Sequence, residues 1–143
     1  MIQAADLGLR KLLGDHVATA RLGIIGGGQL ARMTALAALP LGCDVVFLER
    51  DSNCPAAWLA PRLIVGDWSD PETLRSFAEQ VDVITLENEF VSSTQLAWLE
   101  ESGHRVFPTA ASMASVQDKF VQKQTLAGGG TARGRVSRGR LDR

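Results

Sequence analysis

The feature that most constrains this chain is a short apolar run that ends in three consecutive glycines, directly before a helical pattern. Glycine has no Cβ, so the backbone there can turn sharply and approach a ligand closely. The N-terminus of the following helix adds exposed N–H donors and a partial positive charge, which favour an anion such as phosphate. The residues of this glycine loop are Gly26, Gly27, Gly28, Gln29 and Leu30.

Strands and helices alternate along the rest of the chain. Apolar, β-branched and aromatic runs predict strands, and signals such as Asp70-Pro71 predict helix starts. In the first helix, Leu30, Met33, Leu36 and Ala37 share one face. The alternation predicts an α/β fold, with a parallel sheet and helices on both of its faces. Strands are expected at 21–25, 44–48, 63–65, 81–86 and 105–107, with helices at 29–38, 71–80, 93–101 and 109–127 and a short one at 55–60.

The 143 residues fit one domain with additions at each end. We expect an N-terminal extension over 1–20 with a loose helical pattern, a folded domain over 21–127 and a tail over 128–143. The net charge of −1 divides into −5 over residues 1–127 and +4 over the tail. The tail is rich in glycine and arginine, so we expect it to be disordered.

Several classes of protein are disfavoured by what the sequence lacks. No run has the length of a bilayer span, and the first 20 residues do not have the form of a secretory signal. We therefore expect a cytoplasmic protein that makes no membrane contact. Cys43 and Cys54 are expected to be reduced, and His16 and His104 lie at no metal-ligand spacing, so no metal site is predicted.

An acidic turn follows the fourth predicted strand. It contains Glu87, Asn88 and Glu89. Because ligands of parallel α/β sheets bind beyond the carboxyl ends of the strands, this turn and the glycine loop are expected on the same edge. The alternative is that the acids form a solvated surface loop with no ligand.

The glycine loop also fits a dinucleotide fingerprint. Gly26, Gly28 and Ala31 match G-x-G-x-x-A, and Glu49 follows 23 residues after Gly26. This spacing would place a carboxylate on the ribose of NAD(P), as in an oxidoreductase. A further alternative is a tight turn that binds nothing.

The wider order of motifs points elsewhere. The chain reads GIIGGGQLARM at 23–33, IVGD at 64–67, DPETL at 70–74, TLENE at 85–89 and QDK at 117–119. In this order and spacing, residues 21–127 resemble the N-terminal part of the 5-(carboxyamino)imidazole ribonucleotide synthase family, the ATPase subunits of phosphoribosylaminoimidazole carboxylase. This family belongs to the ATP-grasp enzymes of purine biosynthesis. The resemblance implies a Rossmann-like preATP-grasp domain.

The resemblance also implies an activity. In the family, ATP and bicarbonate form carboxyphosphate, and the carboxyl group passes to the exocyclic amine of 5-aminoimidazole ribonucleotide. Magnesium offsets the charge of the nucleotide phosphates. The implied partners are thus 5-aminoimidazole ribonucleotide, ATP and bicarbonate. Family members commonly dimerise, so a homodimer is possible, and a non-catalytic dimerisation module is an alternative function.

Site residues carry over where the motifs match. The resemblance implies that Gly26–Leu30 lies against the ribonucleotide, near its 5′-phosphate, and that Glu87 and Glu89 accept hydrogen bonds from its hydroxyls or amino group. Lys119 matches a basic residue that reaches ATP, although an ordinary surface lysine is the alternative. Phe90 and Ser92 depart from the residues usual in the family. No catalytic residue is assigned.

The resemblance stops after residue 127. The family continues into the ATP-binding domain, whereas this chain continues into the tail. We therefore expect a chain truncated before the ATP-grasp domain that does not catalyse the reaction alone. The tail would be an out-of-frame end or a nucleic-acid-binding segment. The sequence disfavours the nucleic-acid-binding segment, because the tail has no aromatic residue for base stacking.

Overall fold

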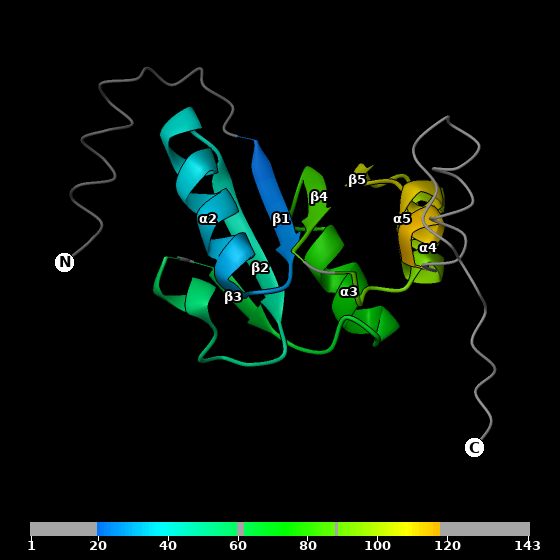
Figure 1. Ribbon diagram of the computed structural model, residues 1–143, viewed down its shortest axis with the longest axis horizontal. Coiled ribbons are helices and arrows are strands. Elements are labelled where there is room, and N and C mark those ends of the chain that lie inside the picture. Colours follow the sequence, from blue (N-terminus) through cyan, green and yellow to red (C-terminus); the bar gives the residue numbers. More distant parts are fainter. Residues whose placement is uncertain (1–19, 60–61, 88, 118–143) are drawn as a thin grey trace, which may run out of the picture.

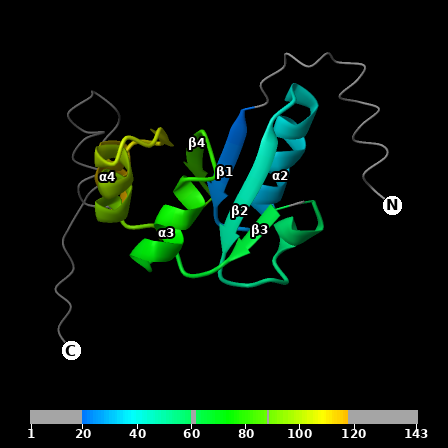
Figure 2. The same cartoon turned by 180° about the vertical axis from the view of Figure 1, so that it is seen from behind.

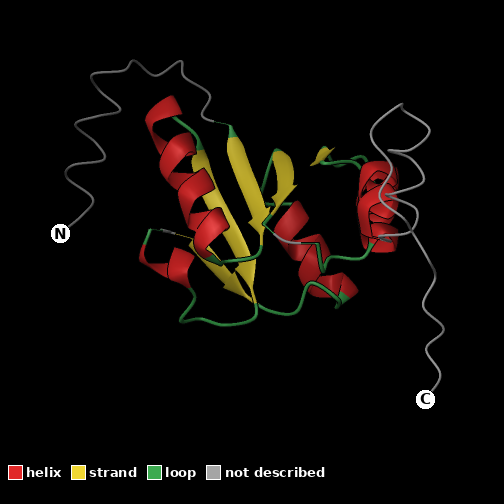
Figure 3. Ribbon diagram, viewed as in Figure 1, coloured by secondary structure: helices red, strands yellow, loops and turns green. Residues whose placement is uncertain are grey.

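The computed structural model describes residues 20–59, 62–87 and 89–117. In these residues the chain forms a parallel sheet with the strand order β3-β2-β1-β4-β5 (Figures 1 and 3). The predicted parallel α/β fold is confirmed. The strands are β1 (Arg21–Ile25), β2 (Asp44–Glu49), β3 (Arg62–Val65), β4 (Val83–Leu86) and β5 (Val106–Phe107).

Helices cover both faces of this sheet, as predicted. Helix α2 and the short η2 pack on one face, whereas α3 and α4 pack on the other, and α5 lies beside α4 (Figures 1 and 2). No described helix is both long and apolar enough to cross a membrane. The helices are α2 (Gln29–Ala38), η1 (Leu39–Leu41), η2 (Pro55–Trp58), α3 (Pro71–Ala78), α4 (Ser93–Glu101) and α5 (Ala110–Gln117).

The strands divide their side chains between two apolar clusters. Ile24 and Phe47 pack with the α2 side, whereas Ile25 and Leu48 pack with the α3 side. This is the period-two alternation of a strand, and both faces are apolar because both are covered. Gly23 lets the Phe77 ring of α3 pack directly against β1, because a Cβ at position 23 would lie 2.6 Å from that ring.

Helix α2 has the predicted bounds but buries a different face from the apolar one that the sequence suggests. Its buried residues are Ala31, Ala35 and Ala38. Leu30 is 60% exposed and Met33 is 56% exposed, and Leu36 and Ala37 are also exposed. Alanine brings the helix axis closer to the strands than leucine would allow, so the small face is the one that packs on the sheet.

The ends of the helices follow local signals. Asp70 accepts hydrogen bonds from the Thr73 hydroxyl (2.6 Å) and backbone N–H (3.1 Å), and these contacts lower the pKa of Asp70. The Ser92 hydroxyl caps α4. Helix α3 ends at Ala78, two residues before the predicted end. Strand β4 begins at Val83 and not at the predicted residue 81, because Val81 is buried in the turn between the two elements. Residues 1–19 of the predicted extension over 1–20, the predicted helix beyond residue 117 and the predicted tail lie outside the described residues.

The strand order creates a switch point between β1 and β4. The chain leaves β1 towards β2 on one side, and it later adds β4 on the other side of β1. In folds of this kind, ligands bind in the crevice outside the carboxyl ends of the strands at such a switch point. The glycine loop follows β1, and the acidic turn follows β4.

Candidate functional site

The glycine loop is a tight turn whose backbone is held by neighbouring strands. Gly26 has a φ of 108°, a left-handed conformation that glycine adopts most easily, and its N–H donates to Leu48 O at 2.9 Å. Gly27 O accepts from Ala56 N at 2.9 Å, which joins the loop to η2. Gly28 is the N-cap of α2 and supplies no side-chain cap, so the first turn of α2 keeps unpaired donors towards the crevice.

Glu49 binds the glycine loop directly. Its Oε2 accepts from Gly27 N at 2.7 Å, and its Oε1 accepts from Arg50 N at 2.6 Å. Its backbone oxygen accepts from Gly66 N at 2.9 Å. Both carboxylate oxygens are thus engaged with this protein's own backbone, whereas the dinucleotide alternative needs this carboxylate to bind a ribose.

Glu87 reaches the glycine loop from β4. Its backbone N–H donates to Ile25 O at 3.0 Å, which brings the start of the acidic turn beside the end of β1. Its carboxylate fills the space next to Gly28, because a Cβ built on Gly28 would lie 2.2 Å from Glu87 Oε1. Only a glycine at position 28 leaves room for this arrangement. The structure therefore brings together Gly28 and Glu87, two residues predicted from sequence.

The other predicted residues lie further out. Gln29 and Leu30 are exposed at the first turn of α2. Glu89 is exposed, and its backbone carbonyl accepts from Gln117 Nε2 at 2.9 Å. Lys119 lies outside the described residues.

Sequence reasoning did not find three residues that support the site. Gln117 donates to the backbone carbonyls of Glu89 and Val91, at the end of the acidic turn, and Gln95 donates to Trp68 O after β3. The Cys54 thiol packs where a Cβ of Gly27 would stand. Their partners lie about 26–28 residues away in the chain, so no local motif marks these contacts. Cys54 is free and buried, and Cys43 is free, as predicted.

The charge at the crevice is mainly negative. The carboxylate of Glu49 lies against Gly27 and that of Glu87 against Gly28, at the positive end of the α2 dipole. This arrangement suits ligand groups that donate hydrogen bonds, such as hydroxyls and amines, better than a second anion. Within the described ranges, no group of three His, Cys, Asp or Glu side chains could hold a metal ion.

Arg50 directly follows β2, at the same carboxyl edge of the sheet. Its guanidinium lies 4.1 Å from the centre of the Trp68 ring and binds Asp67 at 2.6 Å. The Ser69 backbone N–H, and then the Arg50 guanidinium, lower the pKa of Asp67. The charge of Arg50 is thus already paired within the protein.

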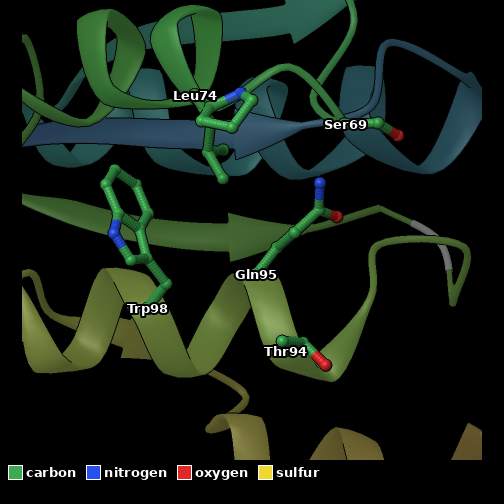
Figure 4. Close-up of a pocket in the computed structure, with 6 residues that line it drawn as sticks. Ser69, Leu74, Thr94, Gln95 and Trp98 are labelled. Atoms are coloured by element: carbon green, nitrogen blue, oxygen red, sulfur yellow. The ribbon is translucent and has the colours of Figure 1, made fainter.

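A cavity of about 290 Å³ opens between α3 and α4 (Figure 4). Its lining is mostly apolar, and it includes none of the site residues predicted from sequence. Gln95 forms part of its wall, but the side-chain amide of Gln95 is already bound to Trp68 O at 2.8 Å. The lining residues are Ser69, Pro71, Leu74, Thr94, Gln95 and Trp98.

Comparison with known proteins identifies the family. Residues 19–117 match the ribonucleotide synthetase preATP-grasp domain. The chain belongs to this family. It is 44% identical over 105 residues to N5-carboxyaminoimidazole ribonucleotide synthase of Brucella melitensis, and 38% identical over 109 residues to that of Mycobacterium bovis. These matches cover 73% and 76% of this chain but 29% and 25% of the relatives, so the chain spans less than a third of their length.

Solved structures agree with this assignment. An ADP complex of an N5-carboxyaminoimidazole ribonucleotide synthetase has a TM-score of 0.74 at 34% identity, covering 78% of this chain and 29% of that one. The Aspergillus clavatus enzyme, in complex with ADP and 5-aminoimidazole ribonucleotide, has a TM-score of 0.70 at 32% identity, with 78% and 30% covered. The preATP-grasp domain predicted from sequence is therefore confirmed.

Proposed function

We propose that this preATP-grasp domain binds 5-aminoimidazole ribonucleotide for an ATP-dependent carboxylation by bicarbonate. The observation that carries the proposal is the contact between the Glu87 carboxylate and Gly28 at the switch point. The Aspergillus relative that binds this ribonucleotide supports the choice of ligand. The chain spans under a third of its relatives' length, so the step we assign to it is binding.

We further propose which end of the ribonucleotide faces the loop. Glu87 and Glu89 would accept hydrogen bonds from the ribose hydroxyls or the exocyclic amine, and the free N–H groups at the start of α2 would donate to the ribose oxygens. A phosphate at 4 Å from one carboxylate would be repelled by about 4 kcal/mol per pair of unit charges at an effective dielectric constant of 20. We therefore propose that the 5′-phosphate lies away from Glu49 and Glu87, whereas the family resemblance implied a place near the glycine loop.

We also propose how ATP and magnesium would be bound in the whole reaction. Lys119 would bind an ATP phosphate through its point charge. Magnesium, when bound with ATP, would neutralise the nucleotide phosphates.

Titration of the isotope-labelled chain tests this function. We expect 5-aminoimidazole ribonucleotide, and its riboside without the phosphate, to shift the backbone NMR signals of Gly26–Leu30 and Glu87. Inorganic phosphate should leave the same signals in place. If phosphate alone shifted these signals and the riboside did not, the orientation would be wrong. If neither the ribonucleotide nor the riboside bound, the proposed function would fail.

Self-association is a second proposal, and it rests on α2. Leu30, Met33 and Leu36 form an exposed apolar row on this helix, and apolar rows of this kind favour a partner surface. We propose that two copies of the chain associate through this row. Sedimentation equilibrium should show a dimer that Met33→Lys weakens, whereas a monomer at all concentrations would exclude it.

A further inference from the structure

Gln117, at the end of α5, connects this helix to the acidic turn. Its side-chain Nε2 donates to Glu89 O at 2.9 Å and to Val91 O at 2.6 Å. One amide group thus uses both of its N–H bonds on two carbonyls that lie on either side of Phe90. Gln117 is separated from these carbonyls by 28 and 26 residues in the sequence, so the contact is tertiary.

The helix that carries Gln117 is itself anchored. At its first turn, Ala110 N donates to Glu100 Oε1 of α4 at 3.0 Å. Met113 is buried in the core between these ends. The Gln117 amide therefore extends from a fixed support, which is a condition for a side chain to hold a loop in one place.

The two carboxylates of the acidic turn have different supports. Glu87 is held by its backbone bond to Ile25 O, at the end of β1. The backbone after Glu89 is held by Gln117, and the Val91 side chain is fully buried beneath it. On the far side of this segment, the Gln95 Oε1 accepts from Ser92 N at 3.3 Å. Gln117 thus bonds the backbone carbonyl of Glu89 itself.

We propose that Gln117 is a positioning residue that sets the place of Glu89 in the ribonucleotide site. This inference rests on the function proposed above. A neutral amide suits the task, because it offers two donors without a charge beside the Glu89 carboxylate. Methionine has a similar shape and no donor, so it would leave both carbonyls without this partner.

The test compares Gln117→Met with Gln80→Met. Gln80 is a matched control, because its Nε2 also donates to a backbone carbonyl, Ser76 O at 2.9 Å, near the end of α3 and away from the acidic turn. Three quantities are measured in the full chain: the carbonyl ¹³C shifts of Glu89 and Val91, the dissociation constant for 5-aminoimidazole ribonucleotide and the melting temperature.

We expect Gln117→Met to move both carbonyl shifts. It should also weaken ribonucleotide binding roughly 5- to 30-fold, the effect of losing one hydrogen bond between the ligand and a displaced Glu89 carboxylate. Gln80→Met should change neither quantity, even if it lowers the melting temperature by a similar amount. If Gln117→Met does not fold, Gln117→Asn replaces it, because its amide is one methylene too short to reach both carbonyls.

The outcomes separate this inference from the function on which it rests. Failure of the wild-type chain to bind the ribonucleotide would refute the proposed function, but the carbonyl shifts would still report on Gln117. Unchanged shifts in Gln117→Met would overturn the inference. It would also be overturned if both variants weakened binding equally, because that result indicates a general loss of stability.

Discussion

Substitution of Gly28 by alanine should separate binding from folding. Gly28 has a φ of −74° and a ψ of −166°, an extended backbone that alanine adopts without strain. The added methyl group would lie 2.2 Å from Glu87 Oε1, whereas ordinary contacts begin at 3.4 Å. The carboxylate must therefore retreat by about 1.2 Å. Because this oxygen is the far end of a flexible side chain, the fold can accommodate the move.

We expect Gly28→Ala to weaken ribonucleotide binding but to leave the free energy of unfolding nearly unchanged. Loss of one hydrogen bond to a charged carboxylate costs about 1.5–3 kcal/mol, which is a roughly 10- to 150-fold weaker affinity for the ribonucleotide. Alanine is a poorer N-cap than glycine by somewhat under 1 kcal/mol. Alanine also lowers the conformational entropy of the unfolded chain, which stabilises the folded state by about 0.4–1 kcal/mol. The free energy of unfolding should thus change little.

Gly23→Ala provides the matched contrast. Its methyl group would lie 2.6 Å from Phe77 Cζ and 2.8 Å from Val81 Cγ2, in the core and away from the crevice. Overpacking of this kind costs about 1–3 kcal/mol. We therefore expect Gly23→Ala to lower the free energy of unfolding while the folded protein keeps its affinity.

The assay is NMR titration with 5-aminoimidazole ribonucleotide, together with urea unfolding of both variants. The double variant Gly28→Ala/Glu87→Asp should recover part of the affinity, because the shorter acid leaves room for the methyl group. Normal ribonucleotide binding by Gly28→Ala would refute the reasoning. So would a loss of unfolding free energy as large as that of Gly23→Ala.

Three further predictions follow from other contacts. Glu49→Leu should reduce the free energy of unfolding by about 1–3 kcal/mol in urea titration, because Gly27 N–H loses its acceptor; an unchanged midpoint would contradict this role. NADH should show no saturable binding by fluorescence, because the Glu49 carboxylate already binds the loop, and a saturable curve would restore the dinucleotide alternative. The hydrogen bond from the Thr73 hydroxyl lowers the pKa of Asp70 in the folded state. The stability that this bond provides is therefore complete above the ordinary carboxyl pKa of about 3.9, and it is lost as the pH falls through the lowered pKa. The melting temperature of the wild type should therefore fall more steeply than that of Asp70→Asn between about pH 4 and pH 2; parallel curves would exclude this contribution.

Local signals in the sequence predicted most of the fold. The bounds of β1 and α2 agree with the prediction, and Asp70 caps the helix whose start it was expected to mark. These features depend on residues within a few positions of each other, so a short stretch of sequence contains the information. The ends of α3 and β4 differed by two residues, because burial of Val81 extends the turn between them.

The buried face of α2 could not be predicted in the same way. Leucine and methionine are more apolar than alanine, so the sequence favours the row that contains Leu30 and Met33 as the packed one. The structure packs Ala31 and Ala35 against the sheet instead. The distance between helix and sheet decided the face, and this distance is a property of the assembled layers.

The sequence by itself determined the glycine turn, the two acids after β4 and the edge of the sheet on which they meet. It could do so because parallel strands bring their carboxyl ends to one edge whatever their details. Only the tertiary structure decided that Glu49 binds Gly27, that Glu87 fills the space beside Gly28 and that Gln117 holds the backbone after Glu89. These contacts join residues 22 to 59 positions apart, and they depend on strand register and helix packing that no single segment contains.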